Sequence, residues 1–187
     1  MRIITGKYKS KRIFAPKNLP VRPTTDMAKE SLFNILNNRY YFEDLTVLDL
    51  FAGIGSISFE FASRGTKNIT SVDQNTGCIK FIDSINDELQ LDLRTVKSDV
   101  YKFLKRSSEQ KYDIIFADPP YNFEEIKFQN IIDLVFENKM LHEDGILIVE
   151  HSSHTDLSKG KGYKQSKKYG GNMFSFFDAF QTTLTQP

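Results

Sequence analysis

From residue 46 onward, short apolar runs alternate with segments of helical periodicity, and this alternation constrains the fold more than any other feature. Five runs have the length of buried strands: TVLDLF (46–51), NITSVD (68–73), LRTVK (93–97), YDIIFAD (112–118) and GILIVEH (145–151). Helices are expected between them near residues 55–64, 75–90, 99–107 and 124–138. Strands that alternate with helices form βαβ units, so the pattern predicts an α/β fold whose parallel sheet carries helices on both faces.

The N-terminal part of the chain lacks this alternation. Residues 1–15 alternate loosely around Gly6 and predict a basic β-hairpin. Three prolines then keep the chain extended. Thr25 or Asp26 can cap a helix that runs to about Asn38, because its apolar residues recur at helical spacing.

The C-terminal part predicts a second hairpin. GYKQSKKYG and MFSFFDAF flank the Gly170–Gly171 bend and are expected to form an antiparallel hairpin that closes one edge of the sheet. We therefore expect two parts: a basic arm over residues 1–25 that packs on the remainder, and one main domain over residues 26–187.

The bulk composition excludes several classes of protein. A chain of 187 residues with 40 % apolar and 26 % charged residues has the profile of a soluble globular protein. It has no apolar run of the roughly 20 residues that a membrane helix needs, and the segment MRIITGKYKSKR lacks the apolar stretch expected of a signal peptide. Cys78 is the one cysteine and suits a reducing cytoplasm, and the three histidines do not predict a metal site. No long exposed apolar edge is evident, so a monomer is expected.

Positive charge is concentrated in two segments although the net charge is only +1. Residues 1–25 hold seven Lys or Arg and no acid, and SKGKGYKQSKK holds five lysines. Such segments attract phosphate backbones, whereas the alternative is a solvated tail and a solvated loop. The candidate RNA-binding residues are Lys7, Lys9, Lys11, Arg12, Arg22, Lys164 and Lys167.

The first strand ends in the glycine-rich sequence LDLFAGIGSIS. Gly53 and Gly55 would allow a ligand to approach the backbone, beside the free N–H groups of a helix N-terminus. A dinucleotide fingerprint would place a third glycine at position 58, which is Ser58, and this argues against NAD. A plain tight turn is the alternative reading of the two glycines.

Acids follow the next two strands. Asp73 could bind both hydroxyls of a ribose, and Asp99 could accept from an adenine amine. Each could instead only cap the helix that follows it. Because the carboxyl ends of parallel strands meet at one edge of a sheet, these acids and the glycine loop together predict an adenosine pocket.

The fourth strand ends in DPPY, residues 118–121. Pro119 and Pro120 stiffen the turn and remove two N–H donors, so that carbonyl oxygens remain as acceptors. A planar base with an exocyclic amine fits this turn: the amine would donate to Asp118 and to the Pro119 carbonyl, and the base would stack on Tyr121. The alternative is a simple turn with a capping Asp118.

DLFAGIG, SVD and DPPY, in this order and spacing, are similar to the motifs of class I S-adenosylmethionine-dependent methyltransferases that act on amines. Longer segments extend the likeness over nearly the whole chain: RIITGKYKSKRIFAP, VRPTTDMAKESLFNIL, DLFAGIGSISFEFASRGT and KKYGGNMFSFF. They resemble the bacterial 16S rRNA (guanine(966)-N2)-methyltransferase family.

This resemblance implies a Rossmann-like class I methyltransferase fold: a seven-stranded, mostly parallel sheet whose last hairpin supplies one antiparallel strand. It implies S-adenosylmethionine as cofactor, with the segment from Arg22 to Thr25 closing over its methionine end; Arg22 could instead hold an RNA phosphate. The implied cofactor-binding residues are Thr24, Asp49, Phe51, Ala52, Gly53, Gly55, Asp73, Gln74, Asp99, Val100 and Asp118.

The resemblance also implies an enzyme that methylates the exocyclic N2 amine of a guanine in 16S rRNA, as free rRNA or as part of the small ribosomal subunit. The guanine would be flipped out of its RNA context onto Asp118, Pro119, Pro120 and Tyr121, the implied catalytic residues, without a metal. Alternative hypotheses are a DNA adenine-N6 methyltransferase, a catalytically inactive RNA-binding or assembly protein, and a methyltransferase for small molecules or proteins.

Overall fold

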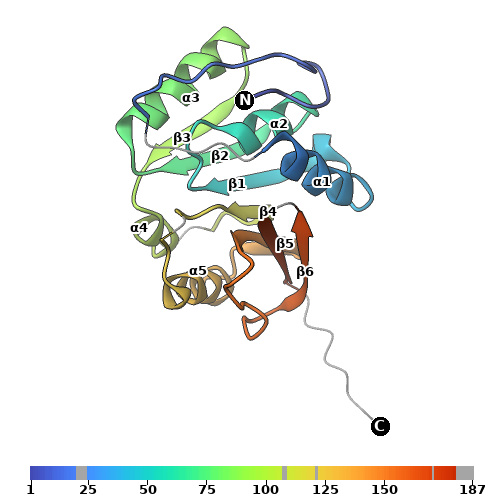
Figure 1. Cartoon of the computed structure of the whole chain (residues 1–187), viewed down its shortest axis with the longest axis vertical. Coiled ribbons are helices and arrows are strands. Elements are labelled where there is room, and N and C mark those ends of the chain that lie inside the picture. The colour runs from blue at the N-terminus through green and yellow to red at the C-terminus, as the bar shows by residue number, and fades with distance from the viewer. Residues whose placement is uncertain (20–24, 107–108, 121, 170, 180–187) are drawn as a thin grey trace.

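The computed structural model describes residues 1–19, 25–106, 109–120, 122–169 and 171–179 (Figure 1). In these ranges a seven-stranded sheet has the order β3-β2-β1-β4-β5-β7-β6. The strands are β1 (Thr46–Leu50), β2 (Asn68–Asp73), β3 (Leu93–Lys97), β4 (Tyr112–Ala117), β5 (Leu141–Ser152), β6 (Tyr163–Tyr169) and β7 (Asn172–Asp178). The helices are α1 (Asp26–Asn37), the 3-10 helix η1 (Phe42–Asp44), α2 (Ser56–Ser63), α3 (Thr76–Glu88), α4 (Val100–Leu104) and α5 (Glu125–Glu137).

The strand directions confirm the predicted sheet. β3, β2, β1, β4 and β5 pair in parallel. β7 is antiparallel to both of its neighbours, β5 and β6, so β6 runs in the same direction as the parallel strands. The predicted C-terminal hairpin therefore supplies one antiparallel strand, which lies inside the sheet, while β6 forms the edge.

Helices cover both faces of the sheet because the central strands are apolar on both sides. In β4, Ile114 and Phe116 pack in one cluster with residues of α1, α2 and α3. Ile115 and Ala117 point to the other face and pack with residues of α4 and α5. The expected arrangement of helices is thus confirmed, and it places the carboxyl ends of β1, β2, β3 and β4 along one edge of the sheet.

Helix α1 begins at the predicted cap. The Thr25 hydroxyl oxygen accepts a hydrogen bond from the Ala28 N–H at 3.2 Å, which satisfies a donor of the first turn. Leu32 and Leu36 on the predicted apolar face are fully buried, and this burial fixes the helix against the sheet.

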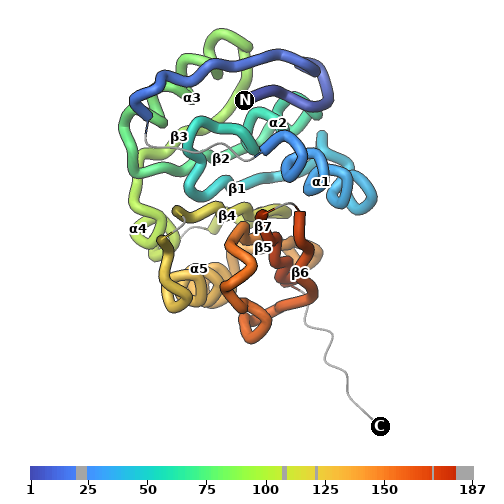
Figure 2. The backbone as a smooth tube through the Cα atoms, viewed as in Figure 1, coloured from blue at the N-terminus to red at the C-terminus, as the bar shows by residue number. Residues whose placement is uncertain are grey.

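The N-terminal segment, residues 1–19, follows a hairpin path joined by one β-bridge, between Arg2 and Arg12. It runs along α2 and α3 (Figure 2). The ladder is short because other groups take its backbone donors: the N–H groups of Ile4 and Thr5 donate to the Glu60 carboxylate on α2 at 2.8 and 3.0 Å. Hydrogen bonds to the Glu60 side chain of α2 thus take the place of the strand-to-strand hydrogen bonds that a longer hairpin ladder would have.

A buried charge junction lies beneath this segment. The Lys29 ammonium donates to the Arg2 carbonyl at 2.6 Å and to the Ser56 hydroxyl at 3.3 Å, and lies 3.7 Å from Glu60. Arg64, the C-cap residue of α2, also donates to Glu60 at 3.0 Å. Lys29 and Glu60 are 1 % and 0 % exposed, so the junction ties α1, α2 and the N-terminal segment together out of contact with water.

Candidate active site

The loop after β1 turns sharply at the edge of the sheet. Phe51, Gly53 and Gly55 all adopt positive φ angles, of 61°, 55° and 76°. This conformation is easy for glycine and costly for phenylalanine, and such strain is typical of functional loops. A side chain at Gly55 would come within 2.7 Å of the Phe59 ring, so Gly55 serves the packing of α2 and does not line the cavity described below.

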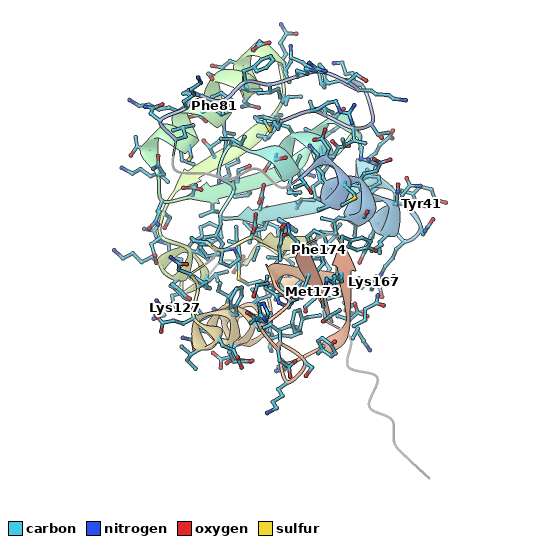
Figure 3. The ribbon with its side chains drawn as sticks, viewed as in Figure 1. Tyr41, Phe81, Lys127, Lys167, Met173 and Phe174 are labelled. Atoms are coloured by element: carbon cyan, nitrogen blue, oxygen red, sulfur yellow. The ribbon has the colours of Figure 1, made fainter. Side chains whose placement is uncertain are left out.

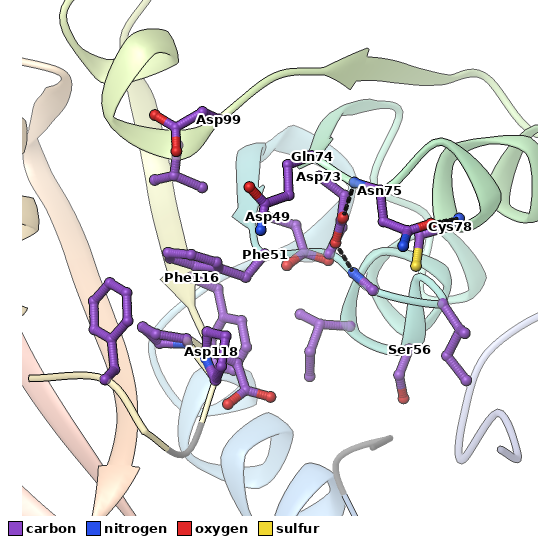
Figure 4. A pocket seen from close by; sticks show the side chains of 18 of the residues that line it. Asp49, Phe51, Ser56, Asp73, Gln74, Asn75, Cys78, Asp99, Phe116 and Asp118 are labelled. Carbon is purple, nitrogen blue, oxygen red and sulfur yellow. Dashed lines mark hydrogen bonds between the residues drawn. The ribbon is translucent and has the colours of Figure 1, made fainter. Parts of the chain in front are cut away.

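Asp73 joins the loops that follow β1 and β2. Its carboxylate accepts from the Gly53 N–H at 2.8 Å and from the Asn75 N–H at 2.7 Å. Figure 4 shows both hydrogen bonds at the wall of the cavity. Asp73 is half-buried and faces the cavity, so it both orders the loops and remains available to a ligand.

Asp49 lies deeper, at the end of β1, and is 2 % exposed. It accepts from the hydroxyl and the N–H of Ser58, at 2.5 and 3.2 Å, and the Ser58 hydroxyl also contacts that of Ser71 at 2.7 Å. Burial raises the pKa of Asp49 to about 7, against the lowering effect of the Ser58 hydrogen bonds. Ser58, which departs from the dinucleotide pattern, therefore has a role as the partner of this carboxylate.

Asp99 caps the helix that follows it, and its contact with adenine stays a prediction. Its carboxylate caps α4 by accepting from the Lys102 N–H at 3.0 Å, and the residue also lines the cavity. The cap fixes the side chain at the carboxyl edge of β3, where it can accept from a ligand as well.

These loops enclose a cavity of about 640 Å³. Of the predicted cofactor-binding residues, it is lined by Asp49, Phe51, Ala52, Gly53, Asp73, Gln74, Asp99, Val100 and Asp118. Gly55 does not line it, and Thr24 lies outside the described residues. The sequence reasoning missed the lining residues Ile54, Ser56, Ile57, Asn75, Cys78, Tyr101, Phe116 and Phe123. Some of them follow directly after a predicted residue, which is the signal that could have identified them.

The turn after β4 carries Asp118, Pro119 and Pro120 and borders the cavity, while Tyr121 lies outside the described residues. Phe123 supports the turn: its N–H donates to the Pro120 carbonyl at 3.0 Å. The Phe123 ring packs edge-on against Phe51 and Phe128, with centroid distances of 5.6 and 5.0 Å, so aromatic contacts link this turn to the loop after β1.

Asp118 stands at the boundary between two cavities. Besides the large one, it lines a small cavity of about 30 Å³ together with Pro119, Pro120, Phe123, Phe128, Glu150, His151, Ser152, Thr155 and Asn172. Burial raises the pKa of Asp118 well above its usual range, and the charges of Glu150 and Asp49 raise it further. The sequence reasoning did not identify Glu150, His151 or Asn172, because they come from β5 and β7 and carry no local motif.

The two basic segments lie apart. Lys7 and Lys9 are exposed on the N-terminal segment along α2 and α3, as is Arg12, whereas Lys11 pairs with Glu88 at 2.7 Å. Lys164 and Lys167 lie on the edge strand β6 at the other end of the sheet (Figure 3). Arg22 lies outside the described residues. The structure therefore places the basic residues on two sides of the molecule.

Two further findings concern the described residues alone. They contain no cluster of three or more His, Cys, Asp or Glu side chains that could hold a metal ion. None of their helices is both long enough and apolar enough to cross a membrane.

Comparison with protein families gives a match over residues 1–178 to the family described as "Conserved hypothetical protein 95". The Bacillus subtilis protein YlbH is 34 % identical over 166 residues, which are 87 % of this chain and 88 % of that protein. The "Ribosomal RNA small subunit methyltransferase D" of Buchnera aphidicola is 30 % identical over 154 residues, 82 % of this chain and 76 % of that protein.

Solved structures share the fold. The Escherichia coli protein yhhF superposes with a TM-score of 0.84 at 25 % identity, covering 97 % of this chain and 99 % of that one. A Thermus thermophilus 16S rRNA N2 G1207 methyltransferase, solved with AdoMet and guanosine, gives a TM-score of 0.69 at 20 % identity, covering 86 % of this chain and 45 % of that one. The Rossmann-like fold of this chain is thus shared with methyltransferases, including one solved with AdoMet bound.

Proposed function

The chain belongs to the family described as Conserved hypothetical protein 95, and we propose that it is an enzyme that methylates the exocyclic N2 amine of a guanine in 16S rRNA. The proposed methyl donor is S-adenosylmethionine. The position of Asp118 carries this proposal, because Asp118 lines both the large cavity and the small one. A carboxylate at the boundary between the two cavities can bind the amine of a base, with the methyl donor on one side of that amine and the rest of the base on the other.

The relatives support the substrate class. The Buchnera aphidicola relative is named a methyltransferase of small-subunit ribosomal RNA, and this chain covers 76 % of its length. The substrate proposed here is 16S rRNA, either free or within the assembled small subunit, and the protein is proposed to act on it as a monomer in the cytoplasm.

The residues of the large cavity fit S-adenosylmethionine. Its volume of about 640 Å³ lies within the range of roughly 300–1,000 Å³ usual for small-molecule sites. Asp73 retains lone-pair sites for ribose hydroxyls beyond the two N–H groups it already accepts, and Asp99 faces the cavity as an acceptor for the adenine amine. The Gly53 loop leaves the backbone accessible beside the N-terminus of α2.

The proposed chemistry needs positioning and charge stabilisation. When bound, S-adenosylmethionine supplies a methyl group on a positively charged sulfur, and the carbon–sulfur bond breaks as the amine nitrogen forms its bond to that carbon. Asp118 accepts a hydrogen bond from the amine, and its negative charge stabilises the positive charge that grows on the nitrogen. One N–H proton must then leave, and the raised pKa of Asp118 makes it a suitable acceptor.

The basic residues are the proposed RNA-binding surface. Lys7, Lys9 and Arg12 project from the N-terminal arm, proposed as residues 1–25, and Lys164 and Lys167 project from the main domain, residues 26–187. Contacts at two ends of the sheet would hold a folded RNA across the carboxyl edge between them. Phe14, which is 82 % exposed beside the basic residues of the arm, offers a ring on which a base can stack.

The test is a methylation assay with radiolabelled S-adenosylmethionine and unmodified small ribosomal subunits, with DNA and large subunits in parallel reactions. The products are digested and the labelled nucleoside is identified. We expect N2-methylguanosine from the small subunit. Label in N6-methyladenine of DNA would replace the proposed substrate, and S-adenosylmethionine binding without transfer to any substrate would favour a binding or assembly protein.

A further inference from the structure

Glu150 stands beside Asp118 on the neighbouring strand. The register pairs Ala117, the last residue of β4, with Val149 of β5 in parallel, so the residues that follow this pair in the chain are Asp118 and Glu150. Both residues line the small cavity. Their charges interact, since Glu150 is one of the groups that raise the pKa of Asp118. Two carboxyl groups from adjacent strands therefore face the same small space.

A neighbouring side chain fixes the orientation of Glu150. The Asn172 amide, at the first residue of β7, donates a hydrogen bond to Oε1 of Glu150. A carboxylate offers about four lone-pair sites, so Glu150 can accept from a ligand while it accepts from Asn172. Glu150 is 6 % exposed, and its contact with a base would be shielded from water.

Both ring nitrogens of the histidine that lines the small cavity already have hydrogen-bond partners in the protein. His151 Nδ1 lies 2.8 Å from the Ser152 carbonyl, which can only accept, so Nδ1 carries the proton. Nε2 then accepts from the Ser175 hydroxyl at 2.7 Å. Burial lowers the pKa of His151, which favours the neutral ring. Among the described lining residues of this cavity no Lys or Arg occurs, so the acidic groups that the edge of a base would meet there are Asp118 and Glu150.

Two adjacent acceptors match the edge of only one amine-bearing base. Guanine presents its 2-amine beside N1–H, so two donors are neighbours. Adenine presents its 6-amine beside N1, and cytosine its 4-amine beside N3, and these ring nitrogens carry lone pairs and no hydrogen. We propose that Glu150 selects guanine by accepting its N1–H while Asp118 holds the 2-amine. This inference rests on the proposed function and adds the residue that determines its specificity.

The test changes the hydrogen-bonding groups on the edge of the base. 2-Aminopurine keeps the 2-amine but lacks the hydrogen on N1, so it removes the proposed donor to Glu150. Small subunits are reconstituted from 16S rRNA that carries guanosine or 2-aminopurine at the methylated position, and kcat/KM is measured for each. We expect the wild-type protein to prefer guanosine by at least about 10-fold, because a buried acceptor would otherwise face a lone pair.

Glu150→Gln should change this preference, since the glutamine amide can donate to N1 of 2-aminopurine. We expect the ratio of kcat/KM for guanosine to that for 2-aminopurine to fall at least ~10-fold. Glu143→Gln is the matched control: Glu143 is exposed on the same strand and should leave the ratio unchanged. Affinity for S-adenosylhomocysteine should stay the same in both variants, because Glu150 does not line the large cavity.

The outcomes separate the two proposals. An unchanged ratio in Glu150→Gln, with guanosine methylated by the wild-type protein and S-adenosylhomocysteine still bound, overturns the role of Glu150 alone. Absence of guanosine methylation by the wild-type protein overturns the proposed function and, with it, this inference.

Discussion

The Asp73 carboxylate accepts a hydrogen bond from the Gly53 N–H, with 2.8 Å between the oxygen and the nitrogen. The other carboxylate oxygen accepts from the Asn75 N–H. One acid at the end of β2 therefore orders the glycine loop after β1 and the start of α3, and both lie at the wall of the large cavity.

Asp73→Asn should weaken cofactor binding. An asparagine has one acceptor oxygen, so its NH₂ group would face one of the two N–H donors that the carboxylate satisfies in the wild type. We expect the Kd for S-adenosylhomocysteine to rise at least ~10-fold, the effect of losing one charged hydrogen bond. Isothermal titration calorimetry measures this, with the exposed Asp92→Asn as control. An unchanged Kd in Asp73→Asn would contradict the assignment.

Asp118→Ala should abolish most turnover. We expect single-turnover methylation to slow by at least ~10²-fold, the scale of losing one positioned polar group that stabilises charge. Asp87→Asn, on the exposed face of α3, is expected to react at the wild-type rate. Near wild-type turnover in Asp118→Ala would exclude Asp118 as the residue that holds the amine.

Lys29→Met should destabilise the protein and loosen its N-terminal segment. It leaves a buried Glu60 with one cationic partner fewer, and breaking a buried ion pair costs about 3–5 kcal/mol. Urea unfolding gives the free energy, and limited proteolysis should show faster cleavage within residues 1–13. Lys80→Met, at an exposed position of α3, controls for the substitution itself. Equal stability of Lys29→Met and Lys80→Met would contradict the prediction.

The buried Asp49 predicts a specific pH dependence of stability. Its pKa is about 7 in the folded protein and 3.8 as a free group, so between these pH values the folded state binds a proton that the unfolded state does not. The free energy of unfolding that Asp49 contributes therefore falls as pH rises from about 4 to about 7. We expect the wild type to lose stability relative to Asp49→Asn over this window, by up to about 4 kcal/mol at pH 7.

Chemical denaturation at a series of pH values measures this difference. The asparagine mimics the protonated acid, so the two proteins should be most alike at the acidic end of the window. A difference that stays constant between pH 4 and pH 7 would show that Asp49 titrates at the same pH in both states.

RNA binding should depend on salt through the exposed cations of the N-terminal segment. Replacing Lys7, Lys9 and Arg12 by Gln should lower the slope of log K against log salt by roughly 0.7–0.9 for each phosphate that is no longer neutralised. Lys11→Gln should have a smaller effect, because Lys11 already pairs with Glu88. The control is the exposed Lys67→Gln, in the turn before β2. A slope that does not change in the triple variant would exclude this surface.

The sequence predicted most of the fold because the strands from β1 to β5 contain separate apolar runs bounded by polar residues, whereas the polar edge strand β6 was expected from its hairpin turn. The parallel direction of β1, β2, β3 and β4 follows from the βαβ rule, whereas the pairing of β4 with β1 does not. The N-terminal hairpin was harder, since its backbone donors bind the Glu60 carboxylate more than fifty residues away, and no local pattern records such a contact.

The residues of the site, like the elements of the fold, could be predicted from the sequence only in part. Asp73, Asp99 and Asp118 could be predicted because each follows a recognisable strand, and parallel strands bring their ends together. Gly55 has a positive φ angle, lies against Phe59 and is not among the residues that line the cavity, so its contact with a cofactor stays a prediction. Glu150 and Asn172 could not be found, because their proximity to Asp118 depends on the order of strands across the sheet.

The internal position of β7 has a consequence for synthesis on the ribosome. The large cavity is lined by residues between Asp49 and Phe123, whereas the small one also requires Asn172, from the strand that is made last. At roughly 5–20 residues per second, several seconds separate the emergence of the two sets. Until β7 inserts, β5 presents an unpaired edge, and Glu150 lacks the amide that orients it. During translation, all residues that line the large cavity are therefore made before the last residue that lines the small one.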